Sequence, residues 1–282
     1  MNCLYRTLGI SKQSFHQRLK RQFILEKDSK HLLSQVKELR LGHPRMSSRM
    51  MYGLISPVHL GRDRFEAFCF DNGFKVSMKR SFHRTTNSLG VTRFTNLLEG
   101  KRVTGVNQFW VSDITYYRIG EKFYYITFIL DLYSRFIVGH SVSEDLSTEQ
   151  TTLAALQMAI ETGRPLQGLI FHSDGGGQYY CKEWLKLTRH HQMKNSMCES
   201  VYENAHAERL NGTIKNDYLI PYGIDSFVEL ITNTKKAIWK YNCERPHQSI
   251  GKISPYEFES RLSTPDKKKK SKQKKKKPLL CG

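Results

Sequence analysis

Three apolar segments in the middle of the chain constrain its fold most strongly. They are FWVSDITYYRI (109–119), KFYYITFILDLY (122–133) and RFIVGHSVS (135–143), and all three are rich in aromatic and β-branched residues. Such residues favour strands, and the connectors between the segments are only GE and S. Because connectors this short join antiparallel neighbours, the sequence predicts a three-stranded meander.

A helix and a further strand follow the meander. The segment 147–163 starts with Ser147 as a capping residue, carries apolar residues at helical spacing and ends at Gly163. The segment PLQGLIFHSD (165–174) is a short apolar strand. Since this strand enters the sheet after a helix, we expect it to run parallel to the first strand. The order βββαβ predicts an α/β fold.

The first hundred residues have the pattern of helices. Ser11 can cap a helix that runs through KQSFHQRLKRQ. Apolar residues then recur at helical spacing from Leu25 to Leu39, before Gly42 and Pro44 stop the pattern. The sequence therefore predicts short amphipathic helices in this part of the chain.

The segment 45–76 has two compact apolar clusters on either side of a Ser-Pro turn, with basic residues around them. This composition fits a helix-turn-helix that binds DNA, although a small helical domain with solvated arginines has the same pattern. The candidate DNA-binding side chains of this segment are Arg45, Arg49, Arg62 and Arg64.

The charge of the chain points to a polyanionic partner. Its 282 residues include 45 Lys and Arg against 26 Asp and Glu, which gives a formal charge of +19 and a pI near 9.7. Nucleic acid is the commonest partner of such a protein. Nine lysines lie between residues 266 and 278, and a run of this kind favours a disordered tail. The tail is either a solubility segment or an arm that binds phosphates.

Other classes of protein are disfavoured. The longest apolar run, 123–133, is much shorter than the roughly 20 residues of a membrane span. The N-terminus lacks the apolar core of a signal peptide, so we expect a cytoplasmic protein. The six cysteines are scattered and form no C-x-x-C pair, which argues against a zinc site.

Three carboxylates stand out from their surroundings. Asp113 lies inside an apolar strand, where an unpaired charge costs several kcal/mol. Asp174 closes a strand and is followed by three glycines, while Glu208 lies on a predicted helix, 203–219, away from its apolar stripe. Taken singly, Asp174 would be an ordinary turn residue and Glu208 a surface residue. Together, the three acids suit a pair of Mg²⁺ ions, which bind oxygen ligands and phosphates.

Three further side chains, Asn204, Lys215 and His172, are candidates because of their positions near these acids. Asn204 and Lys215 lie on the same stripe of the helix as Glu208, where they could reach DNA. Asn211 also falls on this stripe, away from the predicted core face. His172 lies two residues before Asp174 and so on the same face of its strand, where it could orient a metal ligand.

Five ordered motifs together resemble the second-frame transposases of the bacterial insertion-sequence 3 family, which share the integrase core of retroviral integrases. The motifs are WVSDITYY, LDLYSRFIVGHSVSEDLST, FHSDGGGQYYCKEW, NAHAERLNGTIKNDY and YNCERPHQSIGKISPYEF, and the resemblance covers about residues 43 to 260. It implies a ribonuclease-H-like integrase core, a mixed five-stranded sheet flanked by helices, preceded by a helical helix-turn-helix region. It also implies a DDE triad of Asp113, Asp174 and Glu208, and a DNA contact for Lys215.

The resemblance implies DNA transposition: metal-dependent hydrolysis at transposon ends and transfer of the 3′ hydroxyl into target DNA. Its implied cofactor is two Mg²⁺ ions, which Mn²⁺ can replace. Its implied partners are DNA, further copies of the chain, and a product of an upstream frame, made separately or as a fusion.

The 33 residues between Asp174 and Glu208 are slightly fewer than in typical members, and the difference falls in CESVYE. The alternatives are a DNA-binding regulator or inactive remnant, and a ribonuclease H-type nuclease.

These patterns together predict five regions and a protein that lies at the bacterial nucleoid in the cytoplasm. The regions are an N-terminal helical segment (1–42), a helix-turn-helix-like region (43–103), the catalytic core (104–225), a helical extension (226–262) and a disordered lysine-rich tail (263–282).

Overall fold

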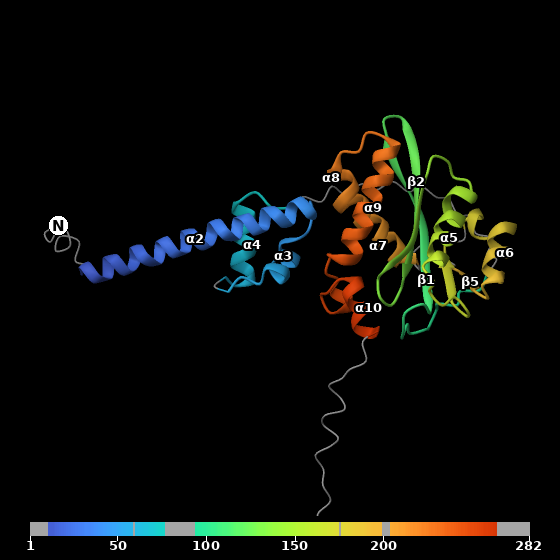
Figure 1. Ribbon diagram of the computed structural model, residues 1–282, viewed down its shortest axis with the longest axis horizontal. Helices are drawn as coiled ribbons and strands as arrows, with labels where there is room; N and C mark the ends of the chain where they lie inside the picture. Colours follow the sequence, from blue (N-terminus) through green and yellow to red (C-terminus); the bar gives the residue numbers. More distant parts are fainter. Residues whose placement is uncertain (1–10, 59, 77–93, 175, 199–203, 264–282) are drawn as a thin grey trace, which may run out of the picture. The chain divides into compact units, whose positions relative to one another are not determined.

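The chain folds into two compact units, residues 1–81 and 82–282 (Figure 1). The computed structural model describes residues 11–58, 60–76, 94–174, 176–198 and 204–263, and it describes the backbone alone at 21–26. The predicted tail therefore lies outside the described residues, except for Ser263. In the part of the chain that is described, no helix combines the length and the apolar character that crossing a membrane requires.

The first unit consists of helices, as predicted, but its N-terminal part is one long helix. Helix α2 spans Lys12–Gly42, and Ser11 caps it by accepting a hydrogen bond of 3.1 Å from the backbone N–H of Ser14. The prediction of short helices is wrong because no glycine or proline interrupts the chain between Lys12 and Leu41. The helix ends at Gly42, where the sequence predicts its end.

Helices α3 (Ser48–Ile55) and α4 (Arg62–Asp71) form the pair predicted from segment 45–76. Ser56 follows α3 in the left-handed region, with a φ of 47°, and ends the helix. The core of the unit combines side chains from α2 with side chains from 43–76, so these two predicted regions share one core. Its fully buried members are Val36, Met46, Met51, Phe65 and Cys69.

The second unit contains a five-stranded sheet with the order β3-β2-β1-β4-β5. The strands pair as predicted: β1, β2 and β3 form the antiparallel meander, and β4 runs parallel to β1. Strand β5 also runs parallel to β4, and its sequence, KNSM, has no pattern that marks it as a strand. The bounds are Phe109–Ile119 (β1), Lys122–Asp131 (β2), Ile137–Ser143 (β3), Ile170–Ser173 (β4) and Lys194–Met197 (β5).

The second and third strands are shorter than predicted because the buried carboxylate of Asp131 organises the turn between them. It accepts hydrogen bonds from the backbone N–H groups of Asn107, Tyr133 and Ser134, at 2.6, 3.0 and 2.8 Å. These bonds replace the ladder at this end of the sheet, so β2 ends at Asp131 and β3 begins at Ile137.

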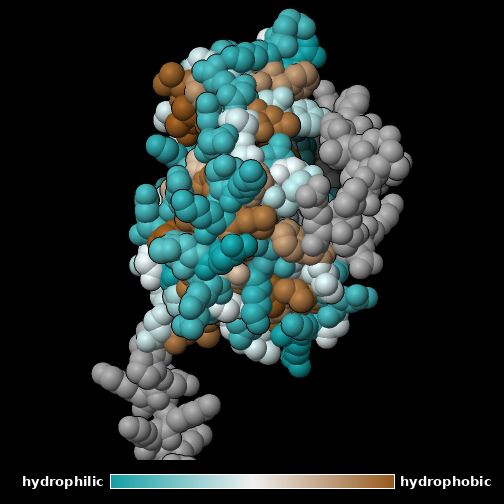
Figure 2. All heavy atoms as spheres, turned by 90° about the vertical axis from the view of Figure 1, so that its right-hand side faces the viewer, coloured by the Kyte–Doolittle hydropathy of each residue, from teal (hydrophilic) through white to brown (hydrophobic). Residues whose placement is uncertain are grey.

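Helices cover both faces of the sheet (Figure 1). Successive residues of β1 point to opposite faces, so Phe109 and Val111 belong to one core and Trp110 to the other. The first core is closed by α7 (Ala205–Ile214) and α9 (Phe227–Cys243). The second is closed by α5 (Ala154–Glu161) and α6 (Lys182–His190), on the side whose largely hydrophilic surface Figure 2 shows.

Short helical segments complete the unit. The predicted helix 147–163 begins as a π-helical turn before α5, and the predicted helix 203–219 divides into α7 and a second π-helical turn. The short helical segments of the second unit are η1 (Glu149–Leu153), η2 (Gly177–Tyr179), η4 (Lys215–Leu219), α8 (Ile220–Tyr222), η5 (Gln248–Ile250) and α10 (Pro255–Ser263).

The YNCERPHQSI segment holds the C-terminal helices onto the sheet. Asn242 binds the backbone of Ile137 twice, through Oδ1 at 2.9 Å and through Nδ2 at 3.0 Å. Arg245 donates to the carboxylate of Asp217 at 2.7 Å, and both side chains are largely buried. Residues 226–262 therefore share a core with 104–225, and the contacts of this motif give it a structural role.

Candidate active site

The alternation of side chains brings two of the predicted acids to one face of the sheet. Asp113 follows Phe109 and Val111 at intervals of two residues, so it faces helix α7. Strand β4 pairs with β1 in a register that sets His172 beside Val111. Continuing this register by two residues sets Asp174 beside Asp113, on the same face.

Two amides attach helix α7 to β1 and thereby position Glu208. Asn204 donates from Nδ2 to the backbone oxygen of Ser112 at 2.9 Å, and Asn211 donates to Asp113 Oδ2 at 2.8 Å. Both amides are buried, at 2% and 7% exposure, whereas Glu208 lies exposed in the first turn of the helix. Their burial shows that both amides belong to the packed side of the helix and not to the exposed stripe of Glu208, while a contact of Asn204 with DNA stays a prediction.

The three acids interact electrostatically. The pKa of Asp113 is raised to about 7, chiefly by burial and in addition by the negative charges of Asp174 and Glu208. The hydrogen bonds from Ile114 N–H and Asn211 act in the opposite sense. Burial also raises the pKa of Asp174, against a hydrogen bond of 3.1 Å from the backbone N–H of Gly176 to its Oδ1.

The three carboxylates are ligands that suit a hard divalent cation, although they do not enclose a metal position. Within the described residues, no group of three or more His, Cys, Asp or Glu side chains is arranged to hold a metal ion as it stands. Carboxylates that raise one another's pKa repel, and a cation between them removes the repulsion. The chemistry of the carboxylates therefore suits Mg²⁺.

A pH dependence of stability follows from Asp113. Its folded-state pKa of about 7 lies above the ordinary value of about 3.9, so the folded protein binds the additional proton between these values. Stability of the metal-free protein therefore falls as the pH rises through this window. Relative to the wild type, the free energy of unfolding of Asp113→Asn should be higher at pH 8 than at pH 4 by on the order of 4 kcal/mol, measured by urea unfolding with a chelator present.

Asp145 provides a control of the opposite sign. Hydrogen bonds from Ser147 lower the pKa of Asp145, so Asp145→Asn should lose stability relative to the wild type as the pH rises from that lowered pKa to about 3.9, and its effect should change little between pH 4 and pH 8. Equal effects of Asp113→Asn at pH 4 and pH 8 would contradict the raised pKa of Asp113.

One side chain of the site was missed from the sequence. Tyr179 is 3% exposed, and its hydroxyl lies 2.9 Å from Ser112 Oγ. Burial raises its pKa well above the ordinary value, and the charges of Asp174 and Asp113 act in the same direction. The hydroxyl therefore stays protonated beside the acids. The GQYY segment after Asp174 gives no signal of this role, since it reads as a turn.

His172 and Lys215 lie near the acids in different environments. His172 is fully buried, and its Nδ1 lies 2.9 Å from Ser196 Oγ on β5, so its orientation of a metal ligand stays a prediction. Lys215 is partly buried with Nζ 4.3 Å from the ring centroid of Tyr116, and burial lowers its pKa. Its contact with DNA also stays a prediction.

The four candidate arginines all lie in the first unit, on or beside α3 and α4. Arg49 pairs with Glu66 at 2.8 Å, and Arg62 pairs with the neighbouring Asp63 at 2.9 Å. Arg64 is exposed, and Arg45 is partly buried. Ion pairs between exposed side chains are weak, so phosphates can compete for these arginines. Their DNA contacts stay predictions.

Comparison with known proteins agrees with this fold. Two family models, both described as "Integrase core domain", match residues 103–201 and 183–255. The chain is 34% identical over 209 residues to the "Insertion element IS600 uncharacterized 31 kDa protein" of Shigella sonnei, covering 72% of this chain and 76% of that protein. It is 30% identical to "Transposase InsF for insertion sequence IS3A" of Escherichia coli strain K12, covering 67% of each.

Among solved structures, the chain is similar to the HTLV-2 integrase catalytic core domain in complex with magnesium. The match has a TM-score of 0.45 and 22% sequence identity, and it covers 54% of this chain and 95% of that one. The extent of the sequence matches to the two insertion-element proteins is what defines the relationship. The chain belongs to the insertion-sequence 3 family of transposases, the enzymes of DNA transposition and integration that use an integrase core.

Proposed function

We propose that Asp113, Asp174 and Glu208 are the catalytic carboxylates of this transposase and that they hold two divalent metal ions. Mg²⁺ is the expected ion and Mn²⁺ a substitute. Two such ions activate a nucleophile and stabilise the attacking and leaving oxygens of an in-line displacement. The observation that carries the proposal is that the negative charges of Asp174 and Glu208 both raise the pKa of Asp113, although the three acids come from two strands and a helix.

The reaction has two steps that use the same three carboxylates. Water first attacks a phosphodiester at a transposon end, which breaks the P–O3′ bond and leaves a free 3′ hydroxyl. That hydroxyl then attacks a phosphodiester of the target, forming one P–O bond and releasing the target's own 3′ hydroxyl. Asn211 holds Asp113 in place during both steps, and Asn204 keeps the start of α7 on the sheet.

A product analysis tests this proposal. Labelled duplexes carrying the element's terminal sequences should yield cleaved ends with Mg²⁺ or Mn²⁺, and joined products when target DNA is added. A chelator should remove both products. Cleavage of RNA in hybrids without any joining would support a ribonuclease, and DNA binding without any metal-dependent product would support a regulator.

The proposal extends to the partners. Joining two ends to one target needs paired active sites, so we infer that the protein works as an oligomer on DNA at the bacterial nucleoid. The helices of residues 43–76 would bind the transposon ends through Arg45, Arg49, Arg62 and Arg64. A product of an upstream frame would add further DNA-binding or oligomerisation segments, either as a separate chain or as a fusion.

The lysines between residues 266 and 278 give a separate prediction about DNA affinity. Deleting 266–282 removes nine lysines, and each lysine that contacts a phosphate releases counterions. We expect the deletion to weaken binding about equally for terminal and unrelated sequences and to flatten the dependence of log K on log salt, measured by fluorescence anisotropy. A salt dependence that matches the full chain would show that the tail does not contact DNA.

A further inference from the structure

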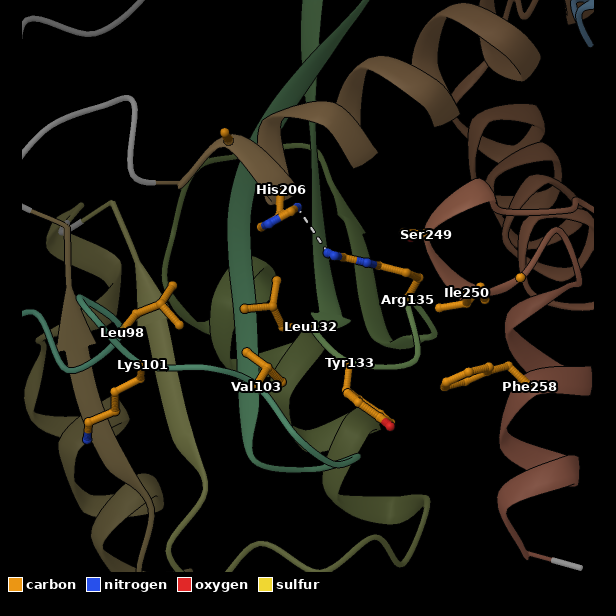
Figure 3. A pocket seen from close by; sticks show the side chains of 12 residues that line it. Leu98, Lys101, Val103, Leu132, Tyr133, Arg135, His206, Ser249, Ile250 and Phe258 are labelled. Atoms are coloured by element: carbon orange, nitrogen blue, oxygen red, sulfur yellow. Dashed lines mark hydrogen bonds between the residues drawn. The ribbon is translucent and has the colours of Figure 1, made fainter.

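One hollow in the second unit takes no part in holding the three carboxylates. Its volume is about 850 Å³, and it lies between the turn that joins β2 to β3, the first residues of α7, and helix α10 (Figure 3). Pockets for organic ligands have volumes of about 300–1,000 Å³, so the hollow is large enough for a nucleotide. It combines a cationic rim with an aromatic wall.

The cationic rim is centred on Arg135. Its Nη1 lies 3.0 Å from His206 Nδ1, and since an arginine only donates, the histidine nitrogen accepts this bond. Lys101 also lines the hollow. Across the described residues, neither Arg135 nor Lys101 is in ion-pair contact with a carboxylate. The buried carboxylate of Asp131 attracts Arg135, but the turn already uses that carboxylate as an acceptor.

The backbone of Arg135 is in a conformation that favours glycine. Its φ is 64°, in the left-handed region, where a side chain is unfavourable. Its own N–H donates to the backbone oxygen of Asp131 at 2.9 Å, which closes the turn. A glycine at position 135 would adopt this left-handed conformation with less backbone strain. The chain instead carries a guanidinium there, directed to the edge of the hollow (Figure 3).

The aromatic wall consists of Tyr133 and Phe258. Their ring centroids are 5.5 Å apart and their planes are inclined by 57°. Figure 3 shows the two rings side by side below Arg135, with Ile250 between the arginine and Phe258. Aromatic rings beside an arginine that forms no ion pair within the described residues match the two parts of a nucleotide, because bases stack on such rings and phosphates bind guanidinium groups.

We propose that this hollow binds one unpaired nucleotide of the DNA strand beside the reacting phosphodiester, with its phosphate on Arg135 and its base against Tyr133 and Phe258. The inference rests on the proposed function. His206, which lines the hollow, lies two residues before Glu208 on α7, so the two side chains leave different sides of the helix about 3 Å apart along its axis. A strand that bends around the start of α7 from Glu208 therefore reaches the hollow within a few nucleotides.

A binding assay without catalysis tests this inference. The probes are a fluorescent blunt duplex and the same duplex with a short unpaired thymidine end, and anisotropy is recorded with a chelator present. The test variants are Arg135→Gly, which suits the left-handed turn and should fold at least as well as the wild type, and Phe258→Ala. Matched controls are Arg189→Gln, an exposed arginine on α6, and Tyr256→Ala, an exposed aromatic residue on α10.

We expect the wild type to bind the duplex with the unpaired end about tenfold more tightly than the blunt duplex. Both test variants should lose this preference, while both controls keep it and thermal melting shows all four proteins folded. No preference in the wild type, or an unchanged preference in Arg135→Gly and Phe258→Ala, would overturn the inference. Because no chemistry is measured, a protein that cleaves no DNA but keeps the preference would refute only the proposed function.

Discussion

Glu208→Gln is expected to abolish cleavage and joining of DNA while leaving DNA binding intact. The substitution keeps the shape of the side chain and removes one negative charge from the metal site. Glu208 is exposed and lies on the helix that Asn204 and Asn211 attach to β1, so the fold does not depend on its charge. We expect a loss of about 10³-fold in rate, which corresponds to about 4 kcal/mol of activation free energy.

Glu183 offers a matched control for this variant. Like Glu208, it is an exposed glutamate in the first turn of a helix, in this case α6. Glu183→Gln should cleave and join DNA at the rate of the wild type. A Glu208→Gln protein that retains its rate, or one that loses DNA binding together with its rate, would show that Glu208 is not a metal ligand in the reaction.

A metal titration gives the same variant a second readout. Mg²⁺ that binds the folded protein raises its melting temperature, because binding to the native state stabilises it. We expect this rise for the wild type and for Glu183→Gln. It should be much smaller for Glu208→Gln, independently of any DNA substrate.

The largest loss of stability is expected from Gly139→Ala. Gly139 lies on β3 where this strand approaches α5 most closely. A Cβ atom there would overlap the backbone oxygen of Ala155 and lie 2.8 Å from the Cβ of Ala159. Both neighbours belong to a helix that is packed against the sheet, so neither can move alone. Overpacking of this kind costs about 3 kcal/mol, and we expect this loss in the free energy of unfolding by urea.

Gly105→Ala is the control for this prediction. A Cβ atom on Gly105 would meet the side chain of Gln108, with its Nε2 at 3.2 Å, and that flexible group can move away. The control should therefore unfold within about 0.5 kcal/mol of the wild type. If Gly139→Ala were as stable as this control, β3 and α5 would not be in the close contact described here.

Most of the sheet was predictable because its information is local. The short connectors of residues 109–143 allow only antiparallel neighbours, and the helix before 165–174 makes that strand parallel to the first. Strand β5 was not predictable in this way. Its four residues carry no apolar pattern, and they become a strand because β4 offers them an unpaired edge.

The helical predictions failed where packing decides the outcome. The stripe of apolar residues on α7 correctly predicted that Ala207, Leu210 and Ile214 face the core. It left Asn204 and Asn211 on the solvent side, because an amide is polar and its partners are unknown before the sheet is built. In the folded protein their partners are Ser112 and Asp113, which lie more than ninety residues earlier in the chain.

The sequence by itself determined which acids are unusual, since a carboxylate inside an apolar strand or before a run of glycines stands out locally. Only the tertiary structure decided that the charges of Asp174 and Glu208 act on Asp113, and that Arg135, Tyr133 and Phe258 line one hollow. The physical reason is distance along the chain. Charge repulsion and side-chain hydrogen bonds act over short distances in space, and the packing of α7 against the sheet and of α10 against α9 brings these residues together.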